Sequence, residues 1–284
     1  MGGFSEKMVG TVLDRRRESG EDDGKDLTII SKFGYASVSM LFSALDAVAD
    51  KKHPGFVKVA PSMSHSLHPD FFRHELKSSS ERLNGNKINV YMIEHPEATL
   101  AAKLGVTAQP SKARMDDARG ALYEEVTALF EAMEERTREE AGFMYGVSSM
   151  GLSMPKDEHL HISWERLVGC AEAAASRIGN VRHSFRVVEM PGNLLEITGL
   201  STAPAIAKAG INVSVCDILA PPSVACACCV WLLSIVHRTY REKLLPEIPL
   251  NSPLVQFTRL NHDGSPPDAS SRSDSLRSLS CARS

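Results

Sequence analysis

Polar side chains that could take part in chemistry stand where the apolar runs of this chain stop. Lys32, Glu94, Ser148 and Glu189 each lie at the end of such a run, and His95 directly follows Glu94. If the runs are parallel strands of one sheet, their carboxyl ends meet at one rim, which is where parallel barrels build their sites. A cation, two carboxylates, an imidazole and a hydroxyl would then share one site, and such groups can hold a substrate and transfer protons.

Lys32 is the most informative of these residues because it ends an apolar run of β-branched residues. A lysine at the end of a buried strand needs an anionic partner or a site to serve. The alternative is a rim lysine whose stem lies along apolar surface while its ammonium group reaches water.

The stretch NVYMIEHPE, residues 89–97, places Glu94 and His95 side by side at the end of another apolar run. Successive side chains of a strand face opposite ways, so only one of the two can face the site, and a bulge of one residue would exchange them. A glutamate in that position would act as an electrophile only in its protonated form, which burial favours by raising its pKa. The other interpretation makes Glu94 a rim residue and His95 a loop residue.

Five short apolar runs are predicted to be the strands that position these groups. Amphipathic segments with helical spacing separate them. The first opens at 68–76 and keeps its apolar spacing to Leu83, and the others lie at 116–141, 163–178 and 204–209. The predicted strands are 27–33, 87–93, 143–148, 184–191 and 211–216. Alternation of strand and helix, with strands that are apolar almost throughout, predicts a buried parallel sheet.

Two α/β architectures fit this alternation: a doubly wound open sheet and a (β/α)8 barrel. No G-x-G-x-x-G motif follows the first strand, which argues against the dinucleotide-binding open sheet. Polar residues at successive strand ends favour the barrel. The predicted fold is therefore an incomplete (β/α)8 TIM-type barrel with about five recognisable parallel strands, interrupted by a long insertion at 36–66 between a strand and its helix.

The patterns divide the chain into three parts. Residues 1–220 carry the strand–helix alternation of the partial barrel, and 221–250 are an apolar, cysteine-containing segment to which no fold is assigned. Residues 251–284 are rich in Ser, Arg, Asp and Pro and are predicted to be disordered.

Composition excludes several classes of function. A formal net charge of −3 gives no electrostatic reason to expect nucleic acid as a partner. The apolar stretch 224–236 falls short of the roughly 20 residues that span a membrane, so no membrane association is expected. The cysteines lack the spacing of a zinc site, and no metal is predicted. Buried, reduced thiols and the lack of a signal sequence predict a cytoplasmic protein.

Several of these pieces together resemble the aldo-keto reductase superfamily over about residues 2–219, three quarters of the chain. The pieces, in chain order, are GGFSEKMVGTVL, IISKFGY, HPDFFRHELKSSSERLN, KINVYMIEHPE, YGVSSMGLSMP and VVEMPGNLLE. In that family a helix beginning G-x-S-E-x-x-x-G follows the second barrel strand. The third strand ends in T-K, the fourth in a histidine before N-P-E, the fifth in G-V-S-N and the sixth in Q-x-P-x-N.

The resemblance implies reduction of an aldehyde or ketone with NADPH or NADH, or the reverse oxidation, on a small-molecule carbonyl substrate. Lys32 falls on the family's catalytic lysine. Glu94 takes the position of its histidine and His95 that of its asparagine. Ser148 and Ser149 match the Ser-Asn pair that holds the cofactor carboxamide, and Glu189 matches a glutamine with the same role. The choice between NADP and NAD stays open.

The family's aspartate and tyrosine, which lie just ahead of the G-x-S-E helix, have no counterpart in this chain. The first two barrel strands and the last also lack a clear match. Tyr35 and Tyr145 lie at other positions and are poor substitutes for the tyrosine. Two further hypotheses therefore remain besides a reductase: a truncated gene product and a non-catalytic binding protein derived from the barrel. For the chain as given we expect little or no turnover, because the acid that protonates the alkoxide is missing.

Overall fold

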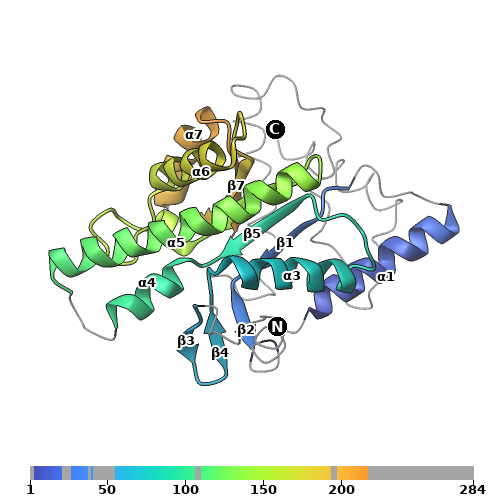
Figure 1. Cartoon of the computed structure of the whole chain (residues 1–284), viewed down its shortest axis with the longest axis horizontal. Helices are drawn as coiled ribbons and strands as arrows, with labels where there is room; N and C mark the ends of the chain where they lie inside the picture. The colour runs from blue at the N-terminus through green and yellow to red at the C-terminus, as the bar shows by residue number, and fades with distance from the viewer. Residues whose placement is uncertain are drawn as a thin grey trace, which may run out of the picture. The chain divides into compact units, whose positions relative to one another are not determined.

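Five of the strands form one parallel sheet in the order in which they occur along the chain (Figure 1). The computed structural model describes residues 3–20, 27–37, 40, 55–105, 110–192 and 197–216. The strands of this sheet are β1 (Ile30–Phe33), β5 (Val90–Glu94), β6 (Met144–Ser148), β7 (Phe185–Pro191) and β8 (Asn212–Cys216). The predicted parallel strands are confirmed, and their sequential order excludes a doubly wound sheet.

Alternation along the strands gives the sheet two apolar faces. Tyr91 and Ile93 of β5 belong to the main core, whereas Val90 and Met92 belong to a second, smaller cluster on the other face. Both faces of β5 are buried, as a parallel sheet requires.

Helices cover the main core. Figure 1 shows α3 (Pro69–Arg82) and α5 (Lys112–Glu139) in front of β1 and β5. The rings of Phe130 on α5 and Tyr145 on β6 have their centroids 4.8 Å apart. The remaining helices are α1 (Phe4–Ser19), α4 (Glu97–Leu104), α6 (Trp164–Ile178) and α7 (Ile197–Lys208), together with the short 3-10 helix η1 (Met150–Ser153).

Two helices differ from the prediction. The segment 204–209 was expected to begin a helix at Pro204, but α7 begins earlier and holds this proline in its interior. The helix α4 was not predicted from the sequence; its N-cap is Pro96, two residues after the end of β5. Proline is tolerated at the start of a helix, where its missing N–H has no partner to lose.

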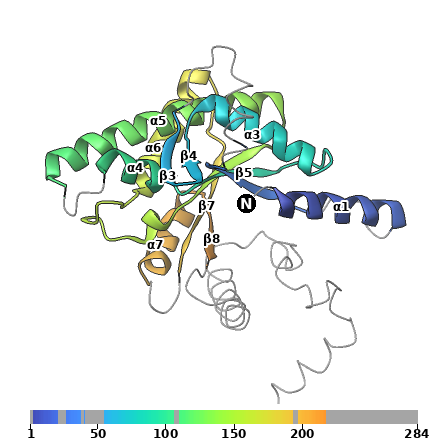
Figure 2. The same cartoon turned by 90° about the horizontal axis from the view of Figure 1, so that it is seen from below.

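The insertion at 36–66 contains a small sheet of its own (Figure 2). Its strands are β2 (Tyr35–Ser37), β3 (Val57–Ala60) and β4 (Met63–His65), antiparallel and in the order β2-β4-β3. The segment therefore begins one residue earlier than predicted and returns the chain beside the end of β1.

Residues 217–284 lie outside the described residues, and so do the predicted boundaries at 220 and 250, the apolar stretch 224–236 and the predicted disordered tail. Among the helices that the structure describes, none has the length and apolar character needed to cross a membrane. The described residues contain no group of three or more His, Cys, Asp or Glu side chains placed to hold a metal ion.

Candidate functional site

Strand register brings the predicted residues into one row at the carboxyl edge of the sheet. Glu94 pairs with Ser148 across β5 and β6, and Ser148 pairs with Glu189 across β6 and β7. Lys32 pairs with Met92, two residues before Glu94, so strand alternation puts Lys32 and Glu94 on the same face. The long lysine side chain can therefore reach the row from the edge strand.

Lys32, Ser148 and Glu189 form a closed triangle of polar contacts. The Lys32 Nζ forms an ion pair with Glu189 Oε1 and donates to Ser148 Oγ at 3.4 Å. Ser148 Oγ in turn donates to the same Glu189 Oε1 at 2.8 Å. Glu189 is thus the anionic partner of Lys32. The family resemblance implies a different role for it, at the position of a glutamine that holds the cofactor carboxamide. The Lys32 side chain is 32% exposed and that of Glu189 17%, so the pair lies at the border of solvent.

Ser149 lies apart from this triangle, although Ser148 precedes it directly. Its hydroxyl donates to Glu97 Oε2 at 2.6 Å and accepts from the Gly151 backbone at 3.0 Å. Glu97 Oε1 also accepts from the Met150 backbone N–H at 3.0 Å, and both Ser149 and Glu97 are buried. These contacts fasten the turn that follows β6 to the start of α4. Glu97 was not singled out from the sequence, although an acidic residue in the first turn of a helix is a usual signal of that position.

Glu94 and His95 take different directions at the end of β5. The β5–β6 register is continuous through Glu94, without a bulge, so Glu94 keeps the face of Lys32. His95 has a φ of 51°, in the left-handed region, and its backbone N–H donates to the Ser148 carbonyl at 2.7 Å. Its Nδ1 lies 3.1 Å from the hydroxyl of Tyr35. The chain therefore turns out of the strand at His95.

Tyr35 and His65 complete a second polar cluster at this edge. The two rings meet edge to face with centroids 5.0 Å apart. His65 is fully buried, and its Nε2 and Nδ1 lie 2.7 Å from the Glu94 carbonyl oxygen and 3.0 Å from Thr99 Oγ1. Burial lowers the pKa of His65 to about 4, so the ring is neutral at pH 7. Sequence reasoning missed His65 because nothing in its local pattern indicates that the insertion packs back on β5.

Two further properties describe this second cluster, one of protonation and one of packing. Burial, followed by the nearby charges of Glu97 and Glu94, raises the pKa of Tyr35 to about 12, so its phenol holds its proton tightly. Gly34 must be a glycine, because a Cβ there would lie 2.7 Å from the Glu94 carbonyl oxygen and 2.8 Å from His65 Nε2. The cluster is thus a close-packed joint between β2, β4 and β5.

Comparison with known proteins gives structural matches only. No protein-family model matches the sequence, and no curated protein matches it either. An aldo-keto reductase from Bacillus halodurans in its holo form matches with a TM-score of 0.41 and 17% identity, over 75% of this chain and 48% of that one. A glycerol dehydrogenase from Gluconobacter oxydans matches with a TM-score of 0.42 and 14% identity, over 75% of this chain and 45% of that one. This chain therefore spans about half the length of the solved structures that it matches.

Proposed function

We propose that the carboxyl edge of this sheet is the nicotinamide-facing rim of an NADPH- or NADH-dependent carbonyl reductase, and that the chain turns over slowly. The observation that carries this proposal is the Lys32–Ser148–Glu189 triangle at the ends of three parallel strands. A lysine held by a carboxylate at such a rim is oriented toward the space above the sheet.

The residues at the rim suit the nicotinamide end of such a cofactor. Lys32 and Ser148 both contact Oε1 of Glu189, which leaves Oε2 to accept a hydrogen bond from a carboxamide NH₂ group. Ser149 is buried against Glu97, so we assign the contact to Ser148 and Glu189 without it. The cofactor, when bound, would supply the hydride.

The chain's own residues would then stabilise the oxygen of the substrate. Lys32 has three N–H donors and uses them toward Ser148 and Glu189, so a further donor is left for a carbonyl oxygen. Charge that develops on that oxygen is stabilised by the fixed ammonium group. Glu94 lies on the same face and can add a second donor only in its protonated form.

Proton supply is the weak step of the proposed reaction. A positioned acid is worth roughly 10²–10⁴ in rate. The Tyr35 hydroxyl contacts His95. Burial and the charges of Glu97 and Glu94 raise the pKa of Tyr35 to about 12, which makes its phenol a weak proton donor. Slow turnover is therefore part of the proposal.

A non-catalytic binding protein is the second candidate, and it has an observation in its favour. Lys32, Ser148 and Glu189 contact one another without any ligand, as a retained structural network would. In that case the rim could still hold a small molecule with no chemistry following.

One experiment separates the two candidates. The full chain is mixed with NADPH, and both cofactor fluorescence and absorbance at 340 nm are followed before and after addition of an activated aldehyde such as 4-nitrobenzaldehyde. The reductase is expected to oxidise NADPH slowly and to lose that activity in Lys32→Met. A fluorescence change without oxidation would favour the binding protein, and neither signal would contradict both.

A further inference from the structure

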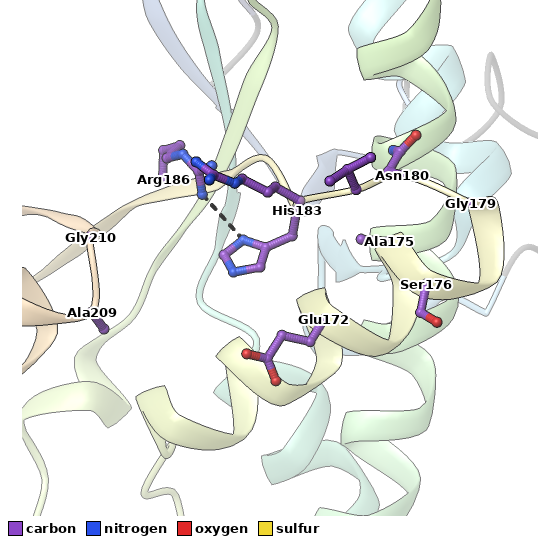
Figure 3. Close-up of a pocket in the computed structure, with 11 residues that line it drawn as sticks. Glu172, Ala175, Ser176, Gly179, Asn180, His183, Arg186, Ala209 and Gly210 are labelled. Carbon is purple, nitrogen blue, oxygen red and sulfur yellow. Dashed lines mark hydrogen bonds between the residues drawn. The ribbon is translucent and has the colours of Figure 1, made fainter.

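A polar pocket lies at the amino-terminal edge of the sheet, opposite the rim described above (Figure 3). Its volume is about 750 Å³. The end of α6, the turn that follows it, the start of β7 and the residues before β8 form its walls. Its polar side chains come from Glu172, Ser176, Asn180, Arg182, His183 and Arg186. None of these residues belongs to the rim proposed above.

The two arginines of this pocket have no carboxylate partner among the described residues. Arg186 donates from one nitrogen of its guanidinium to His183 Nδ1 at 3.3 Å and to the Phe185 carbonyl at 3.0 Å. Arg182 is exposed and forms no hydrogen bond or ion pair with the described part of the chain. A guanidinium carries five N–H donors in a planar fork that matches phosphate and carboxylate oxygens. The pocket therefore presents two cations whose donors are largely unused.

Backbone irregularity places Arg186 in this position. The register between β6 and β7 shifts between Tyr145, which pairs with Phe185, and Gly146, which pairs with Val187. Arg186 is the extra residue of this bulge, and bulges re-aim the side chain that they carry. In the view of Figure 3 the ring of His183 lies between Arg186 and Glu172. The His183 imidazole contacts the Arg186 guanidinium through Nδ1 and has an N–H in either tautomer.

Hydrogen bonds to the buried Glu134 fix the turn that carries Arg182 and His183. Glu134 of α5 is completely buried, and its Oε1 accepts from Tyr145 Oη and from the Ser184 backbone N–H, each at 2.7 Å. Its Oε2 accepts from Asn180 Nδ2 at 2.6 Å. A ligand that binds above this turn would meet donors already in place, which reduces the entropic cost of binding.

We propose that this pocket binds a phosphate group, either free phosphate or the phosphate of a small hydroxylated molecule. A phosphate accepts forked hydrogen bonds from arginine, and two arginines with an imidazole N–H supply the charge and donors. The volume lies within the range of small-molecule sites, so there is room for more than the phosphate itself. Glu172 is the one carboxylate of the wall and can accept from a ligand hydroxyl.

The test is thermal melting of the full chain in sodium phosphate, in glycerol 3-phosphate and in sodium chloride, all at equal ionic strength. A ligand that binds only the folded state raises the melting temperature with concentration. We expect both phosphate compounds to do so beyond sodium chloride, and Arg182→Gln and Arg186→Gln each to weaken the effect about tenfold, as loss of a charge-assisted hydrogen bond implies. Arg182 is exposed, so its variant should fold normally.

The matched control is Arg15→Gln, which makes the same change of charge at an exposed position of α1. It should keep the full response. A tighter response to glycerol 3-phosphate than to phosphate, reduced by Glu172→Gln, would identify a phosphorylated molecule, and equal responses would identify free phosphate. No response beyond sodium chloride, or a response that survives in both pocket variants, would overturn the proposal.

Discussion

The two ends of β7 hold their charged residues in opposite ways. Near the carboxyl end, Glu189 pairs with Lys32 and accepts from Ser148, so the charges neutralise one another. Near the amino end, Arg186 and Arg182 meet no carboxylate among the described residues, while the one buried carboxylate of that region, Glu134, is used to hold the turn. The paired residues can be explained by the protein alone, whereas the unpaired ones need a ligand or water. The contrast is therefore between a carboxyl end whose charges are paired within the protein and an amino end whose arginines are free to bind an anion.

The largest expected effect comes from the buried carboxylate beneath the amino-terminal pocket. Glu134→Ala should lower the free energy of unfolding by about 3–5 kcal/mol, because three donors lose their acceptor inside the protein. The matched control is Glu135→Ala at the next position, a half-exposed partner of Arg73 whose loss should cost at most about 1 kcal/mol. Urea unfolding measures both. Equal losses would mean that Glu134 does not hold the turn.

A smaller effect should appear at the carboxyl edge as a dependence of stability on pH. His65 has a folded-state pKa of about 4, below its ordinary 6.5, so the unfolded chain takes up a proton first as the pH falls. Stability from this group is therefore full above pH 6.5, falls between pH 6.5 and 4, and is lost below 4. The total change is about 3 kcal/mol.

Urea unfolding between pH 4 and 7 tests this expectation. His65→Gln should be less stable at pH 7 and should lack the part of the slope that this histidine contributes. His159→Gln, at an exposed histidine, should keep the wild-type slope. A slope that is unchanged in His65→Gln would show that another group titrates.

The Lys32–Glu189 pair should contribute little to stability despite its place in the site. Both side chains are partly exposed, and ion pairs in such settings give about 0.2–1 kcal/mol. A double-mutant cycle with Lys32→Met and Glu189→Gln measures the coupling directly. A coupling energy well above 1 kcal/mol would contradict this expectation. It would mean that the contacts among Lys32, Ser148 and Glu189 serve mainly to stabilise the fold.

Much of the fold could be predicted because the strands are apolar and β-branched almost throughout. Their parallel, sequential order follows from the helices between them, and it is the order that brings Lys32, Ser148 and Glu189 together. The contacts among these residues could not be predicted. Ser148 and Ser149 look equivalent in the sequence, yet strand alternation and the turn into η1 direct them to different partners.

Other features depend on packing between segments that are distant in the sequence. The contact between Tyr35 and His95 joins residues 60 positions apart, and His65 reaches β5 only because the insertion folds back. The bulge at Arg186 is a property of two paired strands, and no local pattern in either strand indicates it. The helix α7 was mispredicted because proline was taken as a boundary, whereas the apolar residues around it keep the helix packed.

The proposal that the rim supports hydride transfer is tested most directly by following the hydride itself. The full chain is incubated for hours with NADPH deuterated at both C4 positions and with 4-nitrobenzaldehyde, and the alcohol is analysed by mass spectrometry. We predict slow formation of alcohol that carries one deuterium from the cofactor, and its loss in Lys32→Met, with Lys58→Met, at an exposed lysine of β3, unchanged. Absence of deuterated alcohol with the wild-type chain, or equal amounts with Lys32→Met, would contradict the proposal.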